Sequence, residues 1–356
     1  MENGHEVTLA TINGIDWRKV RSIFGESPKL EDRRVSILPS FVPYTYQIPL
    51  SMMAFRKISH GFDLTINTQG DILPAAASIL YLHGPFSYSV SRRSRLYDYL
   101  RESLPSWSYA LHRAYFTPYS AFFDRTMDQA LEDSLMILAN SEYSARIIEL
   151  ESGVKPDVLY PPVDVQRFSC PISTRKDNLI LTVGRFSPDK GYQLIPRLAR
   201  LCPEYDFIVV GTVTSRSYRD NLEREVSALG LDNVKLLVDL PIGQLQSLYA
   251  RAKFYLHTKK FENFGVVVVE AMSAACVPIV PKSGGPWCDI IQRGKYGLGY
   301  TNEREAAELI RSSEGACRER MAALAKERSE AFSYSSFKKQ LLAVAGGIEG
   351  KQGGRG

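Results

Sequence analysis

The sequence lacks several short motifs that mark well-known catalytic sites. It contains no GxxxxGK[ST] phosphate-binding loop, no HExxH, no GxSxG and no Asp-x-Asp pair, so several nucleotide-dependent and hydrolytic mechanisms lose support. Only five of the 356 residues are cysteine, and no two of them form a CxxC pair. Free thiols in a reducing compartment are the simplest interpretation, which favours a cytoplasmic location.

Long hydrophobic runs are also missing. Two 20-residue stretches carry no charge, Ser36–Phe55 and Ile72–Ser91. Both contain proline and several polar groups, unlike the roughly 20 mostly apolar residues of a membrane-spanning helix. The charge imbalance is small, with 44 Lys and Arg against 39 Asp and Glu. It is too weak to indicate a nucleic-acid partner, although it suits phosphorylated ligands or an anionic membrane surface.

The length of the chain, 356 residues, indicates two domains. After Asn178, short β-branched runs alternate with amphipathic segments, which predicts βαβ units and a parallel sheet covered on both faces. The strands expected there are 179–183, 207–211, 234–238, 254–257 and 277–280. The helices expected between them are 193–201, 217–229 and 244–252.

The amino half carries fewer clear runs, and we predict a second parallel sheet there. Its expected strands are 7–10, 35–38, 64–67, 79–82 and 135–139. The proline pair in Tyr160–Asp164 forces extended backbone, so we place the domain connection beside it. The predicted parts are an amino domain at 1–165, a carboxyl domain at 166–330, a returning helix at 331–345 and a disordered, Gly-rich tail at 346–356.

The first candidate site follows the strand expected at 179–183. There Arg185 and Lys190 bracket a tight Ser-Pro-Asp turn in GRFSPDKG, residues 184–191. Open α/β sheets bind ligands at the carboxyl ends of their parallel strands. Arginine supplies a planar fork and lysine a mobile point charge, a pairing that suits a diphosphate. A solvated turn with incidental charges is the alternative.

The second candidate is ENFGVVVVEAM, residues 262–272. Four consecutive valines favour a strand by propensity, but the run continues into helix-favouring residues, and we predict a helix that begins near Phe264. Glu262 then precedes the helix, Glu270 lies about two turns along it, and Gly265 lets a ligand approach the backbone. Free amides there would point at an anion or a sugar oxygen. A solvated helix face with a capping glutamate is the alternative.

Two weaker signals lie at other strand ends. Ser283, Gly284 and Gly285 follow the strand expected at 277–280, and paired glycines allow positive φ and close contact between backbone and ligand. An ordinary strand-to-helix turn is equally consistent with them. His83 ends a strand of the amino half and would face an interdomain cleft if both sheets are parallel. A lone histidine is more often structural.

Together these motifs resemble the family-four retaining glycosyltransferases of the GT-B fold. The matching pieces are GRFSPDKG, ENFGVVVVEAM with its two glutamates, SGGP, YPPVD and ANS at 139–141. The resemblance covers about residues 4–339 and is strongest over 178–300. It implies an α/β fold of two Rossmann-like domains that face each other across a cleft. The family's opening strand and glycine-rich loop have no counterpart before Gly4, so we expect the amino domain to lack them.

The resemblance also implies roles for individual residues. Arg185 and Lys190 would bind the donor diphosphate and stabilise it as the leaving group, and Glu262 would hold hydroxyls of the donor hexose. Glu270 would bind the ribose hydroxyls, and His83 would reach the donor sugar from the amino domain. The remaining donor-binding positions are Asn263, Phe264, Gly265, Ser283, Gly284 and Gly285. Such enzymes need no metal to neutralise the phosphates, so we expect no metal or other cofactor.

Within that family, YPPVD together with SGGPWCDII is most similar to the α-1,2-mannosyltransferases that extend dolichol-linked oligosaccharides with GDP-mannose. Asp289 stands where that pattern carries an acidic residue. A polyprenyl-linked acceptor would explain an excess of arginine between Leu73 and Phe123, which suits an anionic membrane surface. A solvated basic helix over an aromatic core is the alternative. The arginines are Arg92, Arg93, Arg95, Arg101 and Arg113.

These observations leave three interpretations of the activity. The favoured one is a retaining glycosyltransferase that moves a hexose, mannose from GDP-mannose, to a glycan or lipid-linked oligosaccharide at the cytoplasmic face of a membrane. A UDP-sugar-dependent hexosyltransferase is the second. The third is a catalytically inactive GT-B scaffold, because the sequence lacks the family's first loop.

Overall fold

A computed structural model describes residues 5–12, 15–24, 31–34, 44–84, 106–172, 174 and 176–353. By its contacts the chain divides into two compact units. The amino unit is Met1–Leu138 with Ile148–Asp157, and the carboxyl unit is Ala139–Ile147 with Val158–Gly356. The sequence placed the division after residue 165, whereas the contacts group residues 139–147 and 158–165 with the carboxyl unit.

The carboxyl unit is built on a six-stranded sheet in the order β12-β11-β10-β7-β8-β9, and every pair of neighbours is parallel. Counted from β7, this is the doubly wound order 3-2-1-4-5-6. The order reverses between β7 and β10, the two central strands. The strands are β7 (Asp177–Val183), β8 (Asp206–Gly211), β9 (Val234–Val238), β10 (Ala252–Leu256), β11 (Val277–Pro281) and β12 (Leu298–Tyr300).

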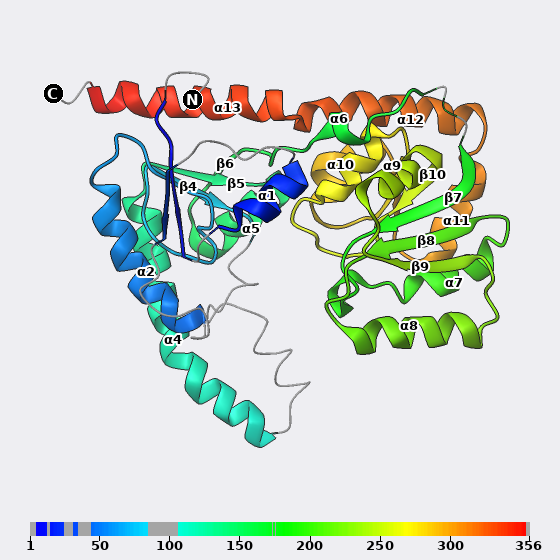
Figure 1. The fold of residues 1–356 in the computed structure, drawn as a ribbon, viewed down its shortest axis with the longest axis horizontal. Helices are drawn as coiled ribbons and strands as arrows, with labels where there is room; N and C mark the ends of the chain where they lie inside the picture. The colour runs from blue at the N-terminus through cyan, green and yellow to red at the C-terminus, as the bar shows by residue number, and fades with distance from the viewer. Residues whose placement is uncertain are drawn as a thin grey trace. The chain divides into compact units, whose positions relative to one another are not determined.

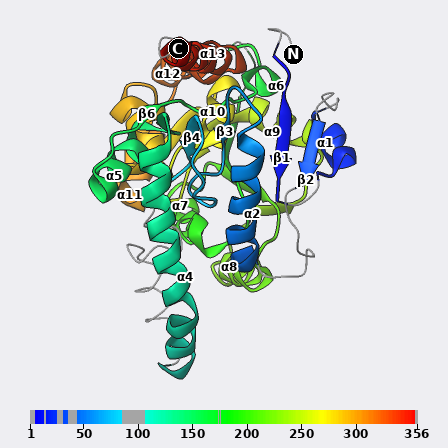
Figure 2. The ribbon, with the colours of Figure 1, turned by 90° about the vertical axis from the view of Figure 1, so that its left-hand side faces the viewer.

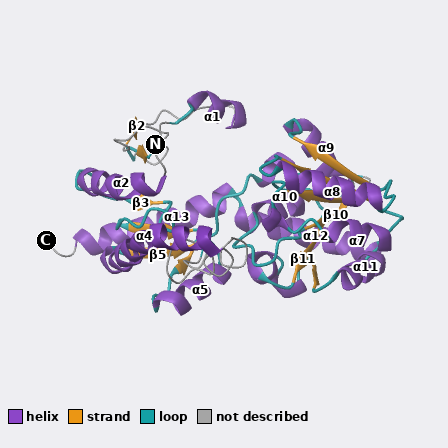
Figure 3. Cartoon of the chain, turned by 90° about the horizontal axis from the view of Figure 1, so that it is seen from below, coloured by secondary structure: helices purple, strands orange, loops and turns teal. Residues whose placement is uncertain are grey.

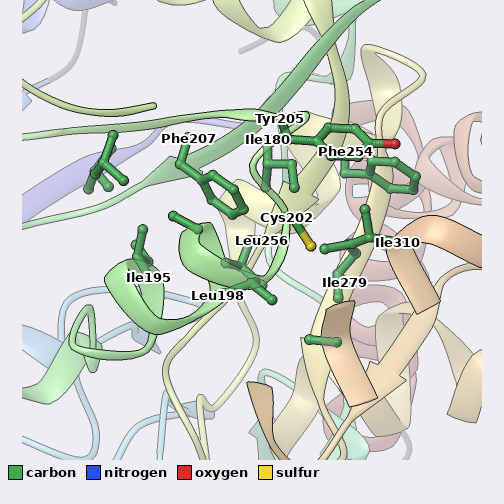
Figure 4. Close-up of a cluster of buried hydrophobic side chains, with 14 of the residues drawn as sticks. Ile180, Ile195, Leu198, Cys202, Tyr205, Phe207, Phe254, Leu256, Ile279 and Ile310 are labelled. Atoms are coloured by element: carbon green, nitrogen blue, oxygen red, sulfur yellow. The ribbon is translucent and has the colours of Figure 1, made fainter. Parts of the chain in front are cut away.

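Helices cover both faces of this sheet (Figures 1 and 3). They are α6 (Val165–Phe168), α7 (Leu194–Leu201), α8 (Arg216–Ala228), α9 (Ile242–Arg251), α10 (Val266–Ser273), α11 (Glu303–Ser312), α12 (Ala316–Ser329) and α13 (Tyr334–Gly353). Strand alternation decides which side chain meets which helix. Phe254 and Leu256 of β10 lie in a core with α7, α8 and α11, part of which Figure 4 shows. Tyr255 lies in the other core, with α6, α9 and α10.

The amino unit contains two separate sheets. β1 (Thr8–Thr11) pairs in parallel with β2 (Glu31–Arg34), and a four-stranded sheet has the order β3-β4-β5-β6. Among its helices, α4 is one continuous helix of 28 residues (Figure 2). The remaining strands are β3 (Ile66–Asn67), β4 (Ile79–Leu82), β5 (Met136–Ala139) and β6 (Asp157–Val158). The helices are α1 (Trp17–Phe24), α2 (Tyr44–Ser59), α4 (Ser106–Asp133) and the second part of α5 (Glu142–Ser152), whose residues up to Ile147 belong to the carboxyl unit.

The structure confirms the α/β class of both halves. All five strands and three helices expected after Asn178 are present, with boundaries that shift by no more than two residues. β12 was not expected, and neither were β2 and β6 in the amino unit. The strand expected at 35–38 and the arginines at 92, 93, 95 and 101 lie outside the described residues, and the side chain of Arg113 is not described.

The disordered tail expected from residue 346 is wrong as far as Gly353, because α13 continues to that residue. Once a helix is under way, each further residue adds one hydrogen bond for each residue fixed. Gly346 and Gly347 therefore weaken the helix by about 1 kcal/mol each without ending it. None of the described helices combines the length and hydropathy that a membrane crossing needs.

Candidate active site

The carboxyl ends of β7 and β10 bring two of the predicted motifs together. β7 ends at Val183 and β10 at Leu256, and these strands are neighbours at the point where the strand order reverses. In doubly wound sheets, ligands bind outside the carboxyl ends of the strands at that reversal. The cationic turn at 184–191 follows β7, and the loop that carries Glu262 follows β10.

The cationic turn is fixed by contacts with the neighbouring loop. Its Pro188–Lys190 segment forms a short 3₁₀ turn that ends at Gly191, whose φ of 67° favours glycine. The Thr258 hydroxyl donates to the Lys190 carbonyl oxygen over 2.6 Å. Arg185 is exposed, and no acidic side chain in the described part of the chain forms an ion pair with it. The backbone therefore holds Lys190 in place and leaves Arg185 available to a ligand.

Glu262 is the centre of a charged cluster formed by the two loops. Its Oε2 lies 3.1 Å from Nζ of Lys190, and its Oε1 lies 3.3 Å from Nζ of Lys259. The Lys259 Nζ also lies 3.5 Å from Oδ2 of Asp189. The side chains of Lys190 and Glu262 are only 18% and 16% exposed, so their attraction is less screened than that of a surface pair. The structure thus joins Lys190 and Glu262, which were predicted from separate motifs.

Burial and nearby charges shift the pKa values of the carboxyl groups in this cluster in opposite directions. Burial alone would raise the pKa of Glu262, but the Lys190 and Lys259 ammoniums outweigh it and hold that pKa below its ordinary value. The pKa of Asp189 is also below its ordinary value. Burial raises it, but the hydrogen bond from Ser187 and the charge of Lys259 outweigh that effect. His257 is buried, and burial lowers its pKa to about 4. At neutral pH the cluster therefore holds two carboxylates, two ammoniums and a neutral imidazole.

The paired glycines predicted to contact a ligand pack against the Glu262 loop. A Cβ on Gly284 would lie 2.6 Å from the Glu262 carbonyl oxygen, and one on Gly285 would lie 2.2 Å from that of Asn263. The Gly285 amide donates to the Glu262 carbonyl over 2.8 Å, and the Ser283 hydroxyl accepts from the Phe261 amide over 3.3 Å. These residues position the Glu262 loop, and direct ligand contact by them stays a prediction.

The helix expected to begin near Phe264 is present as α10, which begins at Val266 with the four valines. Gly265 stands before its first turn with a φ of 100°, which favours glycine. Glu270 is the fifth residue of α10 and accepts a hydrogen bond from the Tyr249 hydroxyl over 3.0 Å. Burial raises the pKa of Glu270, and the Tyr249 bond only partly offsets it. A raised pKa fits a carboxylate in a poorly hydrated position where a ligand hydroxyl can replace water.

Tyr255 of β10 is influenced by the charges of both glutamates. It is fully buried, and its hydroxyl donates to the carbonyl oxygen of Val183, the last residue of β7, over 3.2 Å. Burial raises the pKa of Tyr255, and the charges of both Glu270 and Glu262 add to that effect. The roles of Glu262 and Glu270 with a donor stay predictions.

Two predicted positions next to Glu262 anchor the loop. The Phe264 side chain is 3% exposed and packs against Tyr160 and Phe332, with ring centroids 5.8 and 5.4 Å away. The Asn263 carbonyl oxygen accepts from the Ser141 hydroxyl over 2.6 Å. The buried Oδ1 of Asn263 has no hydrogen-bond partner in the described part of the chain. Asn263 thus retains an acceptor for a ligand, whereas the Phe264 ring is structural.

Asp289 is a structural carboxylate beside this site. Its Oδ1 accepts from the Glu142 amide over 2.6 Å and its Oδ2 from the Tyr143 amide over 3.3 Å, so it caps the first turn of α5. These two bonds, together with the bond from the Ser141 hydroxyl to the Asn263 carbonyl oxygen, join residues 139–147 to the rest of the carboxyl unit. Asp289 is 2% exposed, and burial raises its pKa to about 6.

His83 belongs to the amino unit, directly after β4. Its Nε2 donates to the Thr68 carbonyl oxygen over 2.7 Å, and its ring meets that of Tyr81 at a centroid distance of 4.7 Å. A carbonyl oxygen only accepts, so Nε2 must carry a proton. The role predicted for His83 stays a prediction.

The sequence interpretation missed Lys259 and gave His257 no role. Lys259 and its neighbour Lys260 resemble a solvated basic pair in sequence, and only their spacing from Glu262 hinted at an interaction. Across the described residues, no three His, Cys, Asp or Glu side chains are grouped to hold a metal ion.

Comparison with known proteins defines the class of the molecule. Its fold is GT-B, with neighbours such as Anabaena Alr3699/HepE in complex with UDP, which aligns over 96% of this chain and 92% of its own at 17% identity and a TM-score of 0.70. WaaG, a glycosyltransferase of lipopolysaccharide biosynthesis, aligns over 97% and 92% at 15% identity and a TM-score of 0.68. Residues 168–334 match the family model of glycosyl transferases group 1. This part of the chain, just under half of it, is similar to a glycosyl transferases group 1 domain.

Curated relatives share more sequence with the chain. The GDP-Man:Man(3)GlcNAc(2)-PP-Dol alpha-1,2-mannosyltransferase of Dictyostelium discoideum is 32% identical over 238 residues, which is 59% of this chain and 46% of the relative. The GDP-mannose:cellobiosyl-diphosphopolyprenol alpha-mannosyltransferase of Xanthomonas oryzae pv. oryzae is 27% identical over 58% of this chain and 56% of its own. The chain thus spans about half the length of the curated relatives it matches.

Proposed function

We propose that the protein is a retaining hexosyltransferase that transfers mannose from GDP-mannose to a glycan or lipid-linked oligosaccharide. The contact of Lys190 with Glu262 at the reversal of strand order is the observation that carries the proposal. It places a cation suited to a phosphate beside a carboxylate suited to hydroxyl groups. A sugar diphosphate carries both kinds of group side by side.

The cationic turn supplies the charge that the leaving group needs. When the bond between the sugar and the diphosphate breaks, negative charge grows on the phosphate oxygen. The Arg185 fork and the Lys190 ammonium stabilise that charge. Glu262 and Glu270 accept hydrogen bonds from hydroxyls of the hexose and the ribose, each worth about 1.5–3 kcal/mol because the acceptor is charged. Neutralisation of the diphosphate by these side chains requires no metal.

The donor and acceptor are proposed from the relatives. The names of both relatives give GDP-mannose as the donor. They give a glycan linked to a dolichol or polyprenol diphosphate as the acceptor. A lipid-linked acceptor lies at a membrane surface, so we propose peripheral contact with an anionic membrane on its cytoplasmic face. Co-sedimentation with vesicles that contain acidic phospholipid tests this contact, and equal binding to neutral vesicles would contradict its electrostatic part.

Calorimetric titration with GDP and with UDP, followed by transfer assays with each labelled sugar, tests the proposal. We expect tighter binding of GDP and transfer of mannose to a polyprenyl-linked oligosaccharide, with an α-linkage in the product. Transfer from a UDP-sugar alone would identify the other donor class. Nucleotide binding without any transfer would identify an inactive scaffold. Arg185→Ala and Lys190→Ala should weaken nucleotide binding and transfer together, by about tenfold or more.

A further inference from the structure

Two lysines share one carboxylate at the predicted donor site. Lys190 contacts one oxygen of Glu262 and Lys259 the other, at 3.1 and 3.3 Å. Each ammonium comes from a different loop, and the Lys259 side chain is 26% exposed, against 18% for Lys190. The lysine assigned to the phosphate is therefore paired with the carboxylate assigned to the sugar.

Binding of a diphosphate changes this pairing. The phosphate oxygens compete with Glu262 for Lys190, because one ammonium has only three protons to donate. Glu262 would then keep a single cation within ion-pair distance, Lys259. A half-buried carboxylate that loses its counter-cations either takes up a proton or weakens the binding event that removed them.

In the described part of the chain, no cation other than Lys190 and Lys259 forms an ion pair with Glu262. His257 at the end of β10 has a pKa of about 4 because it is buried, and so is neutral at neutral pH. Besides Arg185 and Lys190, the cationic turn carries Asp189, which is negative and pairs with Lys259. The loop after β11 carries one cation, Lys282, whose Nζ pairs with Oε1 of Glu305 over 2.6 Å, and its Ser283 and two glycines carry no charge. Arg185 is assigned to the phosphate.

We propose that Lys259 is a positioning residue that keeps Glu262 ionised when a bound nucleoside diphosphate takes Lys190. Lys259 holds Glu262 and Asp189 together, so the carboxylate stays in place for the sugar hydroxyls while Lys190 turns to the phosphate. This inference rests on the proposed function and adds a residue that the motifs do not contain.

Titration of the whole chain with GDP tests the inference without any transfer assay. In Lys259→Gln, the affinity for GDP should fall about tenfold, and binding should take up protons, increasingly so from about pH 8 to about pH 6. Proton uptake is measured by calorimetry in two buffers of different ionisation enthalpy. The wild type should take up close to none, and Lys259→Arg should behave like the wild type.

A double-mutant comparison separates an action through Glu262 from direct contact with phosphate. In a Glu262→Gln background the carboxylate that both lysines share is gone, so adding Lys259→Gln should change GDP affinity by less than about twofold. An equal loss in both backgrounds would mean that Lys259 binds the phosphate itself and would overturn the inference. Unchanged affinity and proton uptake in Lys259→Gln would overturn it as well.

Arg251→Gln is the matched control, since it breaks an ion pair with Asp177 at the opposite end of the same strands. It should leave GDP binding and proton uptake unchanged. If the wild type binds neither GDP nor UDP, the proposed function fails and the inference falls with it. If the wild type binds GDP but Lys259→Gln behaves identically, the inference alone fails.

Discussion

The two ends of the carboxyl-unit sheet carry ion pairs of different character. At the amino end, where the strands begin, Lys253 bonds Asn178 and both oxygens of Glu314, and Arg251 pairs with Asp177 in exposed positions. At the carboxyl end one carboxylate, Glu262, is shared by two lysines and is 16% exposed, against 36% for Glu314. Tyr192 Oη, His257 Nε2 and Asn263 Oδ1 are buried there without a hydrogen-bond partner in the described part of the chain.

This difference separates a structural charge cluster from a binding site. A cluster that only stabilises the fold satisfies its donors and acceptors, because an unmet buried polar group costs about 1–3 kcal/mol. The amino end follows that rule. Buried polar groups can stay without a partner where a ligand satisfies them, and at the carboxyl end they belong to the segments that carry Lys190 and Glu262.

Among these variants, we expect Glu262→Gln to cause the largest loss, a decrease in the rate of sugar transfer. The amide keeps the shape of the side chain but loses the charge that strengthens hydroxyl hydrogen bonds. We expect transfer to fall by at least about 10²-fold while GDP still binds. Steady-state transfer rates and calorimetric titration measure the two quantities. Full turnover in this variant would show that the carboxylate does not hold the sugar.

Asp289→Asn tests a carboxylate near the carboxyl end whose role is structural. Its pKa is raised from 3.8 to about 6, so the folded state binds more protons than the unfolded state between these values. Stability should therefore decrease as the pH rises from about 4 to about 6, by up to about 3 kcal/mol. The variant should flatten that dependence in urea unfolding curves measured across this pH range. An unchanged slope would assign the dependence to another group.

Gly285→Ala should displace the backbone of the loop that carries Glu262. The added Cβ would lie 2.2 Å from the Asn263 carbonyl oxygen, which is backbone and must move. We expect a loss of about 1–3 kcal/mol in stability and a clear decrease in transfer. Gly243→Ala in α9 is the matched control, because a Cβ there meets nothing within 4 Å. Equal thermal unfolding of the two variants would contradict the close packing at Gly285.

Arg251→Gln should give the smallest effect. The pair with Asp177 is exposed, with 55% and 44% of the two side chains accessible, and such pairs contribute about 0–1 kcal/mol. We expect unfolding and GDP affinity to match the wild type within error. A large loss of GDP affinity would remove the distinction between the two ends of the sheet.

Much of the carboxyl unit was predictable because its apolar patterns are local. β7 to β11 follow β-branched runs, and the continuation of the valine run into Glu270–Ala275 correctly indicated a helix rather than a strand. β2, with the sequence EDRR, has no apolar alternation that could mark it. The three residues of β12 are too few to show a period.

The site was predictable in its residue types but not in its pairing. Lys190 and Glu262 stood out because their motifs follow strands. Lys259 lies only three residues before Glu262 and pairs with it, but its second contact, with Asp189, reaches a different loop. The glycines at 284 and 285 were assigned to a ligand, since sequence cannot tell a glycine that admits a ligand from one that admits the backbone of Asn263.

The sequence by itself determined where strands and helices form and which charges follow which strand, because periodicity and chain order are properties of short segments. Only the tertiary structure decided that β10 returns to lie beside β7 after β8 and β9 have been placed on its other side. That return brings two distant loops together at one point. Whether charges attract each other depends on distance in space, so the shared pairing of Glu262 with two lysines arises from the fold.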